Sequence, residues 1–180
     1  MSDRPTPVST LIDRLVRPIE DWPAPGVTFR DITPLLADPA GLREVVDALV
    51  DIARKFGHID AVLGIEARGF IFAPAIALAL GVGFIPVRKS GKLPSSSYMT
   101  AYELEYGSAE LEMHRDALGN GDRVLVVDDV LATGGTMLAA ADLVRQSGAE
   151  VAGNIVLIEL LDLGGRERLG PPGCSTLRAY

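Results

Sequence analysis

The segment from Val124 to Thr136 places acidic, glycine and hydroxyl residues in an order that suits a sugar phosphate. It reads Val-Leu-Val-Val-Asp-Asp-Val-Leu-Ala-Thr-Gly-Gly-Thr. Ionised Asp128 and Asp129 are acceptors, so they suit ribose hydroxyls or a Mg²⁺ ion. The glycines let the backbone approach a ligand, and a helix that follows them would direct free N–H groups at a phosphate. The pattern therefore predicts acceptors for a sugar beside donors for its phosphate.

Other interpretations of this segment agree less well with its sequence than a ligand site does. The paired acids could simply close a strand, and Thr-Gly-Gly-Thr could only cap a helix, but the unbroken order of strand, acids, turn and helix favours a site. A Walker B strand also ends in Asp, yet it requires a G-x-x-x-x-G-K-[ST] loop, which this sequence lacks. A dinucleotide G-x-G-x-x-G fingerprint after the first strand is missing as well.

Two strand–helix–strand units are expected to position these residues. The first unit has a strand at Ala61–Leu63, a helix at about Ile71–Leu80 and a strand at Phe84–Val87; the second has a strand at Val124–Val127, a helix after Thr136 and a strand at Val151–Ile158. Continuously apolar strands that alternate with helices predict an α/β fold, here one domain over residues 1–180, with a mainly parallel twisted sheet flanked by helices. Ligands of such sheets bind beyond the carboxyl ends of the strands, where the loops Gly64–Gly69 and Asp128–Thr136 should lie.

Composition limits the class of function. The formal net charge is −7, which disfavours nucleic acid as a partner and favours a small ligand held by a local site. The single cysteine, Cys174, excludes an internal disulfide and fits the reducing cytoplasm. The uncharged stretch Gly69–Val87 is long enough for a membrane helix, but Pro74 and Gly81 interrupt it. We therefore expect a buried helix followed by a buried strand, and no membrane as a partner.

The Val124–Thr136 segment resembles the 5-phosphoribosyl 1-diphosphate motif of the type I phosphoribosyltransferases. Four other segments resemble the adenine phosphoribosyltransferase family in order and at fitting spacing: 26–34, 66–70, 87–94 and 102–107. The resemblance implies the type I phosphoribosyltransferase fold, with a small N-terminal hood at about residues 22–36 and a flexible flap at about 89–106. It also implies a homodimeric, Mg²⁺-dependent enzyme of purine salvage that makes AMP and diphosphate from adenine and 5-phosphoribosyl 1-diphosphate.

Under this resemblance, the phosphoribosyl group is held by the Val124–Thr136 segment. Asp128 and Asp129 would bind the ribose hydroxyls. A Mg²⁺ ion would be held mainly by the diphosphate and ribose of the substrate, with either aspartate as a candidate further ligand. The residues implied to hold the 5-phosphate are Ala132, Thr133, Gly134, Gly135 and Thr136.

The leaving diphosphate requires positive charge. Arg68 lies on the loop after the first strand, between Gly64 and Gly69, where its guanidinium would suit the diphosphate. The alternative for Arg68 is an ordinary surface ion pair. The resemblance implies that three cations at the start of the flap add positive charge near the diphosphate, either within one chain or across a dimer interface: Arg88, Lys89 and Lys92. Solvated side chains are the alternative for each of these three.

For the base, the resemblance implies an apolar slot under the hood. The residues concerned are Val27, Phe29, Arg30 and Leu160. An ordinary core role is the alternative for the apolar members. Tyr106 is implied to contact substrate and Glu105 to handle a base proton, which makes Glu105, Arg68 and Asp128 the expected catalytic residues; a solvated strand face is the alternative for Glu105.

Two other functions remain open from the sequence. One is a phosphoribosyltransferase that acts on hypoxanthine, guanine or xanthine. The other is a non-catalytic regulator that only senses 5-phosphoribosyl 1-diphosphate. Such regulators usually carry a nucleic-acid-binding element, for which residues 1–21 are too short and the acidic charge is unsuitable.

Overall fold

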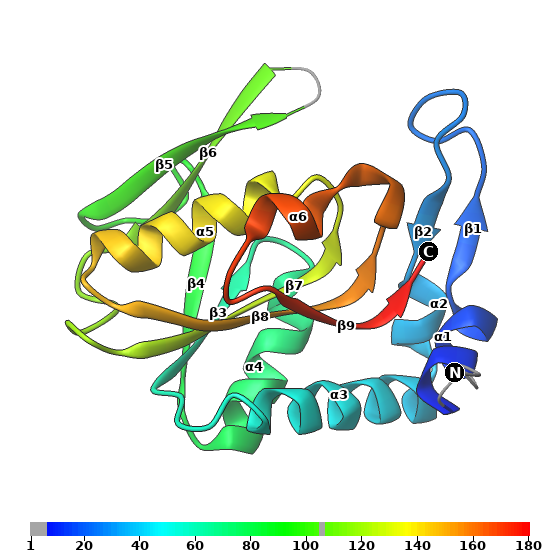
Figure 1. Cartoon of the computed structure of the whole chain (residues 1–180), viewed down its shortest axis with the longest axis horizontal. Coiled ribbons are helices and arrows are strands. Elements are labelled where there is room, and N and C mark those ends of the chain that lie inside the picture. Colours follow the sequence, from blue (N-terminus) through cyan, green and yellow to red (C-terminus); the bar gives the residue numbers. More distant parts are fainter. Residues whose placement is uncertain (1–6, 105–106) are drawn as a thin grey trace. The chain divides into compact units, whose positions relative to one another are not determined.

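The computed structural model describes residues 7–104 and 107–180 (Figure 1). By its internal contacts the chain divides into two compact units, Met1–Ala48 and Leu49–Tyr180. The elements that begin in the first unit are α1 (Pro7–Leu15), β1 (Arg17–Ile19), β2 (Phe29–Asp31), α2 (Thr33–Ala37) and α3 (Pro39–Arg54). Strands β1 and β2 pair antiparallel. Hydrogen bonds from Thr33 and Arg17 hold the carboxylate of Asp31 and lower its pKa to about 2.

The second unit is built on a seven-stranded sheet. Its strands are β3 (Ala61–Ile65), β4 (Gly83–Lys89), β5 (Ser97–Leu104), β6 (Gly107–His114), β7 (Arg123–Leu131), β8 (Glu150–Glu159) and β9 (Cys174–Ala179). The order is β5-β6-β4-β3-β7-β8-β9, in which β4, β3, β7, β8 and β9 run parallel and the β5–β6 hairpin pairs antiparallel with β4. The prediction of a mainly parallel sheet is confirmed.

Helices cover the two faces of this sheet. Helix α4 (Gly69–Leu80) packs on β3, β4 and β7, whereas α5 (Gly135–Gln146) packs on β5, β6, β7 and β8 (Figure 1). A short 3₁₀ turn, η1 (Leu161–Leu163), and helix α6 (Gly165–Leu169) precede β9. All five residues of β3 are buried, as are Val124–Val127 of β7, because helices cover these strands from both sides.

Close packing at a glycine brings the first loop to the second. Helix α4 begins at Gly69, where an added Cβ would lie 2.7 Å from the carbonyl oxygen of Val127 and 3.3 Å from Oδ1 of Asp128. Only a residue without a side chain allows this approach. At its other end α4 stops at Gly81, which has a positive φ of 73°. No helix in residues 7–104 and 107–180 is long and apolar enough to cross a membrane.

The structure differs from the sequence-based expectation at two strands. No strand was predicted in the first part of the expected flap, but β5 begins at Ser97 and pairs with β6 along its whole length. Strand β7 was predicted to end at Val127, yet it continues to Leu131 because β8 is long enough to pair with it, for example Asp128 with Val156. The two aspartates therefore lie within a strand and not in the loop that follows it.

Candidate phosphoribosyl site

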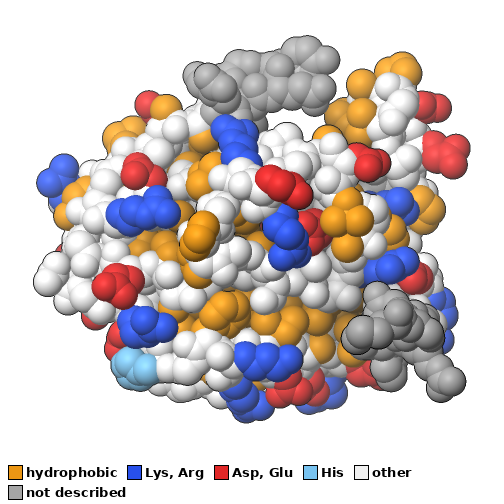
Figure 2. Space-filling view, in the orientation of Figure 1, with side chains coloured by type: hydrophobic (Ala, Val, Ile, Leu, Met, Phe, Trp, Pro, Cys, Tyr) orange, Lys and Arg blue, Asp and Glu red, His pale blue; other side chains and the backbone are white. Residues whose placement is uncertain are grey.

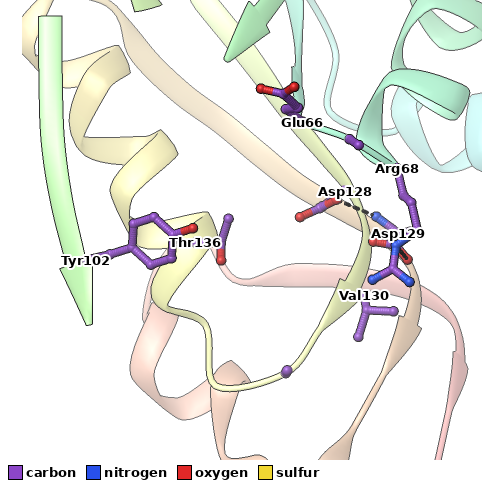
Figure 3. A pocket seen from close by; sticks show the side chains of 9 residues that line it. Glu66, Arg68, Tyr102, Asp128, Asp129, Val130 and Thr136 are labelled. Carbon is purple, nitrogen blue, oxygen red and sulfur yellow. Dashed lines mark hydrogen bonds and ion pairs between the residues drawn. The ribbon is translucent and has the colours of Figure 1, made fainter. Parts of the chain in front are cut away.

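A pocket of about 260 Å³ lies where β3 and β7 end (Figure 3). It is lined by Glu66, Ala67, Arg68, Tyr102, Asp128, Asp129, Val130, Ala132 and Thr136. A smaller pocket of about 60 Å³, lined by Val130–Met137, shares three of these residues. The structure thus brings the loop after β3 and the loop after β7 to adjoining cavities at the same edge of the sheet.

The two aspartates point to different sides of β7, as successive residues of a strand do. Asp129 faces Arg68, and its Oδ2 lies 2.8 Å from Nε of Arg68 (Figure 3). Asp128 points instead toward the side of the pocket where Thr136 and Tyr102 lie. The backbone N–H of Asp129 donates to Oδ1 of Asp128 at 2.9 Å, which fixes that carboxylate. One aspartate is therefore paired within the protein, and the other faces the pocket.

Burial makes negative charge unfavourable at both aspartates. It raises the pKa of Asp128 well above its ordinary value, and the neighbouring Asp129 adds to that shift. Burial also raises the pKa of Asp129, against the lowering effect of the Arg68 guanidinium. The pocket consequently favours a ligand that brings hydrogen-bond donors or positive charge, such as a diol with a Mg²⁺ ion.

A Mg²⁺ ion fits this site only together with a bound substrate. Asp128 offers an oxygen of the kind that Mg²⁺ prefers. Over the residues that the structure describes, however, no three His, Cys, Asp or Glu side chains gather as a metal cluster. A Mg²⁺ ion held here would therefore take most of its coordination from oxygens of a bound substrate.

The turn between β7 and α5 has the geometry of a phosphate cradle. Gly134 caps α5 with a φ of 80°, a conformation that favours glycine. The N–H of Leu138 donates to the carbonyl of Gly134 at 2.9 Å, so helical bonding begins there. The N–H groups of Gly135 to Met137 precede it and have no acceptor within the helix. The residues that carry them line the 60 Å³ pocket, and a helix N-terminus beside a pocket of this size suits a phosphate group.

The first residue of α6 supports this turn. An added Cβ at Gly165 would lie 2.2 Å from the carbonyl oxygen of Ala132 and 3.1 Å from the backbone N of Gly134. We therefore expect Gly165→Ala to displace the turn and to weaken ribose 5-phosphate binding about tenfold or more, measured by isothermal titration calorimetry. Gly83→Ala is the matched control, because an added Cβ at Gly83 meets nothing within 4 Å. Unchanged affinity in Gly165→Ala would show that the turn does not hold the phosphate.

The flap cations occupy another position. Nη2 of Arg88 donates to Oε1 of Glu66 at 3.0 Å, and Nη1 of Arg88 donates to the carbonyl of Lys92 at 3.0 Å. The backbone N–H of Lys89 donates to Oε2 of Glu66 at 3.0 Å. Glu66 lines the pocket, whereas the wall formed by the described residues of this single chain does not include the three cations.

The residues expected to bind a base lie in several places. Val27 is 41% exposed, and Phe29 packs edge-on against Trp22 within the first unit. Leu160 follows β8, where its N–H donates to the carbonyl of Leu131 at 2.9 Å. Arg30 lies in β2. Glu105 and Tyr106 lie outside the described residues.

Sequence reasoning gave no role to four residues that line the pocket: Glu66, Ala67, Tyr102 and Val130. Glu66 follows β3 directly, which is the place where side chains of a parallel sheet meet a ligand. Tyr102 comes from the hairpin, and only the three-dimensional structure places that hairpin beside α5. Position at the end of a strand was thus the signal for Glu66, and Tyr102 had no comparable signal.

Comparisons with known proteins agree with one another. Residues 31–172 match the phosphoribosyl transferase domain family. The adenine phosphoribosyltransferase of Thermobifida fusca is 58% identical over 164 residues, which cover 91% of this chain and 93% of that protein. The crystal structure of adenine phosphoribosyltransferase from Thermoanaerobacter pseudethanolicus has a TM-score of 0.89 at 44% identity and covers 94% of this chain and 98% of that one.

A third similar protein carries ligands. It is the adenine phosphoribosyltransferase of Saccharomyces cerevisiae, whose crystal structure is a complex with an imino-altritol bisphosphate and adenine. Its TM-score is 0.89 at 38% identity, and the match covers 94% of this chain and 98% of that one.

Proposed function

The chain belongs to the phosphoribosyltransferase family, among its adenine phosphoribosyltransferases, and from this we propose that it transfers the phosphoribosyl group of 5-phosphoribosyl 1-diphosphate to adenine. The products are AMP and diphosphate. The observation that carries this conclusion is the meeting of Asp128, Arg68 and the Thr133–Thr136 turn around adjoining pockets. Acceptors for a diol, a cation for a leaving diphosphate and donors for a phosphate are what this substrate requires.

We infer that the reaction is a displacement at the anomeric carbon of the ribose. The N–H groups of the turn hold the 5-phosphate, and Asp128 accepts hydrogen bonds from the ribose hydroxyls. As the bond from carbon to diphosphate breaks, Arg68 stabilises the charge that develops on the diphosphate. A bound Mg²⁺ ion, with Asp128 as a candidate ligand, would neutralise further charge on the diphosphate. Glu105 is proposed to handle the proton that adenine loses.

We propose further that residues 1–180 act as one phosphoribosyltransferase domain, with the hood at residues 22–36 covering the base. Val27, Phe29, Arg30 and Leu160 are the proposed adenine contacts, and Tyr106 is a proposed substrate contact. The family likeness supports these roles, and adenine bound in the similar yeast enzyme supports a base site in this family. The flap cations Arg88, Lys89 and Lys92 are proposed to add positive charge near the diphosphate.

We also propose a cytoplasmic homodimer that binds small molecules and not nucleic acid. Helix α4 is apolar throughout and leaves Leu78 83% exposed and Ile71 38% exposed, which supports a second copy as its cover. On the face seen in Figure 2, basic and acidic side chains are interspersed, and the net charge of −7 opposes binding of a phosphate backbone. The single, buried Cys174 supports a reducing compartment.

One turnover assay tests the proposed reaction. The protein is mixed with 5-phosphoribosyl 1-diphosphate, Mg²⁺ and equal amounts of adenine, hypoxanthine, guanine and xanthine, and the nucleotides are separated by chromatography. We expect AMP as the dominant product. A different dominant nucleotide would reassign the base, and tight binding of the diphosphate substrate without any product would indicate a sensor instead of an enzyme.

A further inference from the structure

Tyr102 forms a wall of the phosphoribosyl pocket opposite Arg68. It lies on β5, and its hydroxyl points toward Thr136, the residue at the start of α5 that lines both pockets (Figure 3). A phenol hydroxyl is a hydrogen-bond donor, and the turn at Thr136 is where the 5-phosphate is proposed to lie. The hydroxyl of Tyr102 is therefore oriented toward the proposed position of the 5-phosphate.

Pairing with β4 does not reach as far as Tyr102. Strand β6 pairs with β4 at Arg88 and Lys89, and a last hydrogen bond runs from the N–H of Ser90 to the carbonyl of Glu110 at 3.1 Å. Tyr102 pairs with Ala109, one residue beyond that bond. At Tyr102 the hairpin therefore extends beyond its pairing with β4, and besides β6 the element on which β5 packs is α5.

A hydrogen-bonded cluster joins β5 to α5 close to Tyr102. The hydroxyl of Thr100 donates to Oδ2 of Asp142 at 2.7 Å. Nε2 of Gln146 donates to the hydroxyl oxygen of Thr100 at 2.7 Å and to Oδ2 of Asp142 at 2.9 Å. We call these three residues the β5–α5 latch. The hydrogen bonds from Thr100 and Gln146 lower the pKa of Asp142, so its carboxylate stays ionised at neutral pH.

The spacing of residues along β5 and along α5 relates the position of Tyr102 to that of the β5–α5 latch. Thr100 and Tyr102 are two residues apart on one strand and therefore share a face, about 7 Å apart. Asp142 and Thr136 are six residues apart on one helix, about 9 Å along its axis. Because β5 packs along α5, the bond between Thr100 and Asp142 sets Tyr102 beside the N-terminal turn of that helix.

We propose that Tyr102 binds the 5-phosphate of 5-phosphoribosyl 1-diphosphate through its hydroxyl, and that the β5–α5 latch positions Tyr102 for this contact. The inference rests on the proposed function and names two further parts of the same site. Tyr102 touches the substrate. Thr100, Asp142 and Gln146 act through Tyr102 and do not touch the substrate themselves.

A double-mutant cycle tests both parts. Tyr102→Phe and Thr100→Val are each expected to raise the KM for 5-phosphoribosyl 1-diphosphate about tenfold, the effect of one hydrogen bond to a charged group, with the KM for adenine and kcat unchanged. The double variant should be no worse than Tyr102→Phe alone, because the latch acts through the tyrosine hydroxyl. Thr100→Ser keeps the hydroxyl and should behave as the wild type.

Two further variants serve as a control and as a substitute in this test. Thr176→Val is the matched control, because its hydroxyl donates to backbone carbonyls on β8 and β9, away from the pocket. If Thr100→Val does not fold, Gln146→Met removes an exposed donor of the latch and should raise the same KM about threefold. Titration of ribose 5-phosphate by calorimetry repeats the cycle without turnover, so it separates failure of this inference from failure of the proposed reaction. Multiplicative effects in the cycle, or a wild-type KM in Thr100→Val, would overturn the proposal.

Discussion

Asp128→Asn is expected to lower kcat/KM for AMP formation by about 10² to 10³-fold, the usual effect of losing one charged contact to a transition state. The amide keeps the carbonyl oxygen that accepts the N–H of Asp129, so the local conformation of β7 should be preserved. It loses the negative charge and one acceptor for the ribose hydroxyls. The measurement is steady-state kinetics with both substrates varied, and Asp162→Asn, an exposed site on η1, is the control.

The same variant should make the unliganded protein more stable. Burial raises the pKa of Asp128 in the folded state, so between the ordinary value of 3.8 and that raised pKa the folded state binds more protons than the unfolded state. The stability of the wild type therefore falls as pH rises through that window. Asparagine has no such charge, so its melting temperature at pH 7 should exceed that of the wild type, with a flatter dependence between pH 4 and pH 8. A lower melting temperature of Asp128→Asn at pH 7 would contradict the assigned burial.

Arg68→Ala should lose both activity and stability. We expect kcat to fall by about 10² to 10³-fold, because the developing charge on diphosphate loses its guanidinium partner. The Asp129 side chain, 5% exposed, would be left buried without its cation. Because Arg68 is itself 42% exposed, we expect a loss of about 1–3 kcal/mol in the free energy of unfolding, below the range for fully buried pairs.

A compensating variant separates the two effects of Arg68. The double variant Arg68→Ala with Asp129→Asn removes the buried charge together with its partner, so it should regain most of the lost stability while activity stays low. Urea unfolding and turnover are measured on the same preparations. Near-normal turnover in Arg68→Ala would refute the role of this side chain in diphosphate departure.

Local sequence was sufficient for the central part of the site. The apolar run Val124–Val127, the paired acids and the Thr-Gly-Gly-Thr turn all lie between Val124 and Thr136, so their order already indicates a strand, an acidic pair and a helix start. The two parallel units and their loops could be predicted for the same reason. The loop after β3 also depends on two glycines: the lack of a side chain at Gly64 lets α4 approach β3, and the lack of one at Gly69 lets α4 approach β7.

Long-range pairing decided what the sequence could not predict. Strand β7 continues to Leu131 because β8 pairs with it, and no pattern within β7 marks that end. Tyr102 lines the pocket, and two residues before it on the same strand Thr100 bonds to Asp142, 42 residues away in the chain. Arg88 is oriented by Glu66, which is 22 residues away. Such contacts depend on the assembled sheet and leave no periodic signal in the sequence.

The central claim is that one pentose phosphate is held by Asp128 and by the turn before α5 together. A crystal structure of the protein with bound AMP tests it most directly. We predict the phosphate in the Ala132–Thr136 turn and a ribose hydroxyl within hydrogen-bond distance of the Asp128 carboxylate. A phosphate bound away from that turn, or a ribose that leaves Asp128 without contact, would contradict the account.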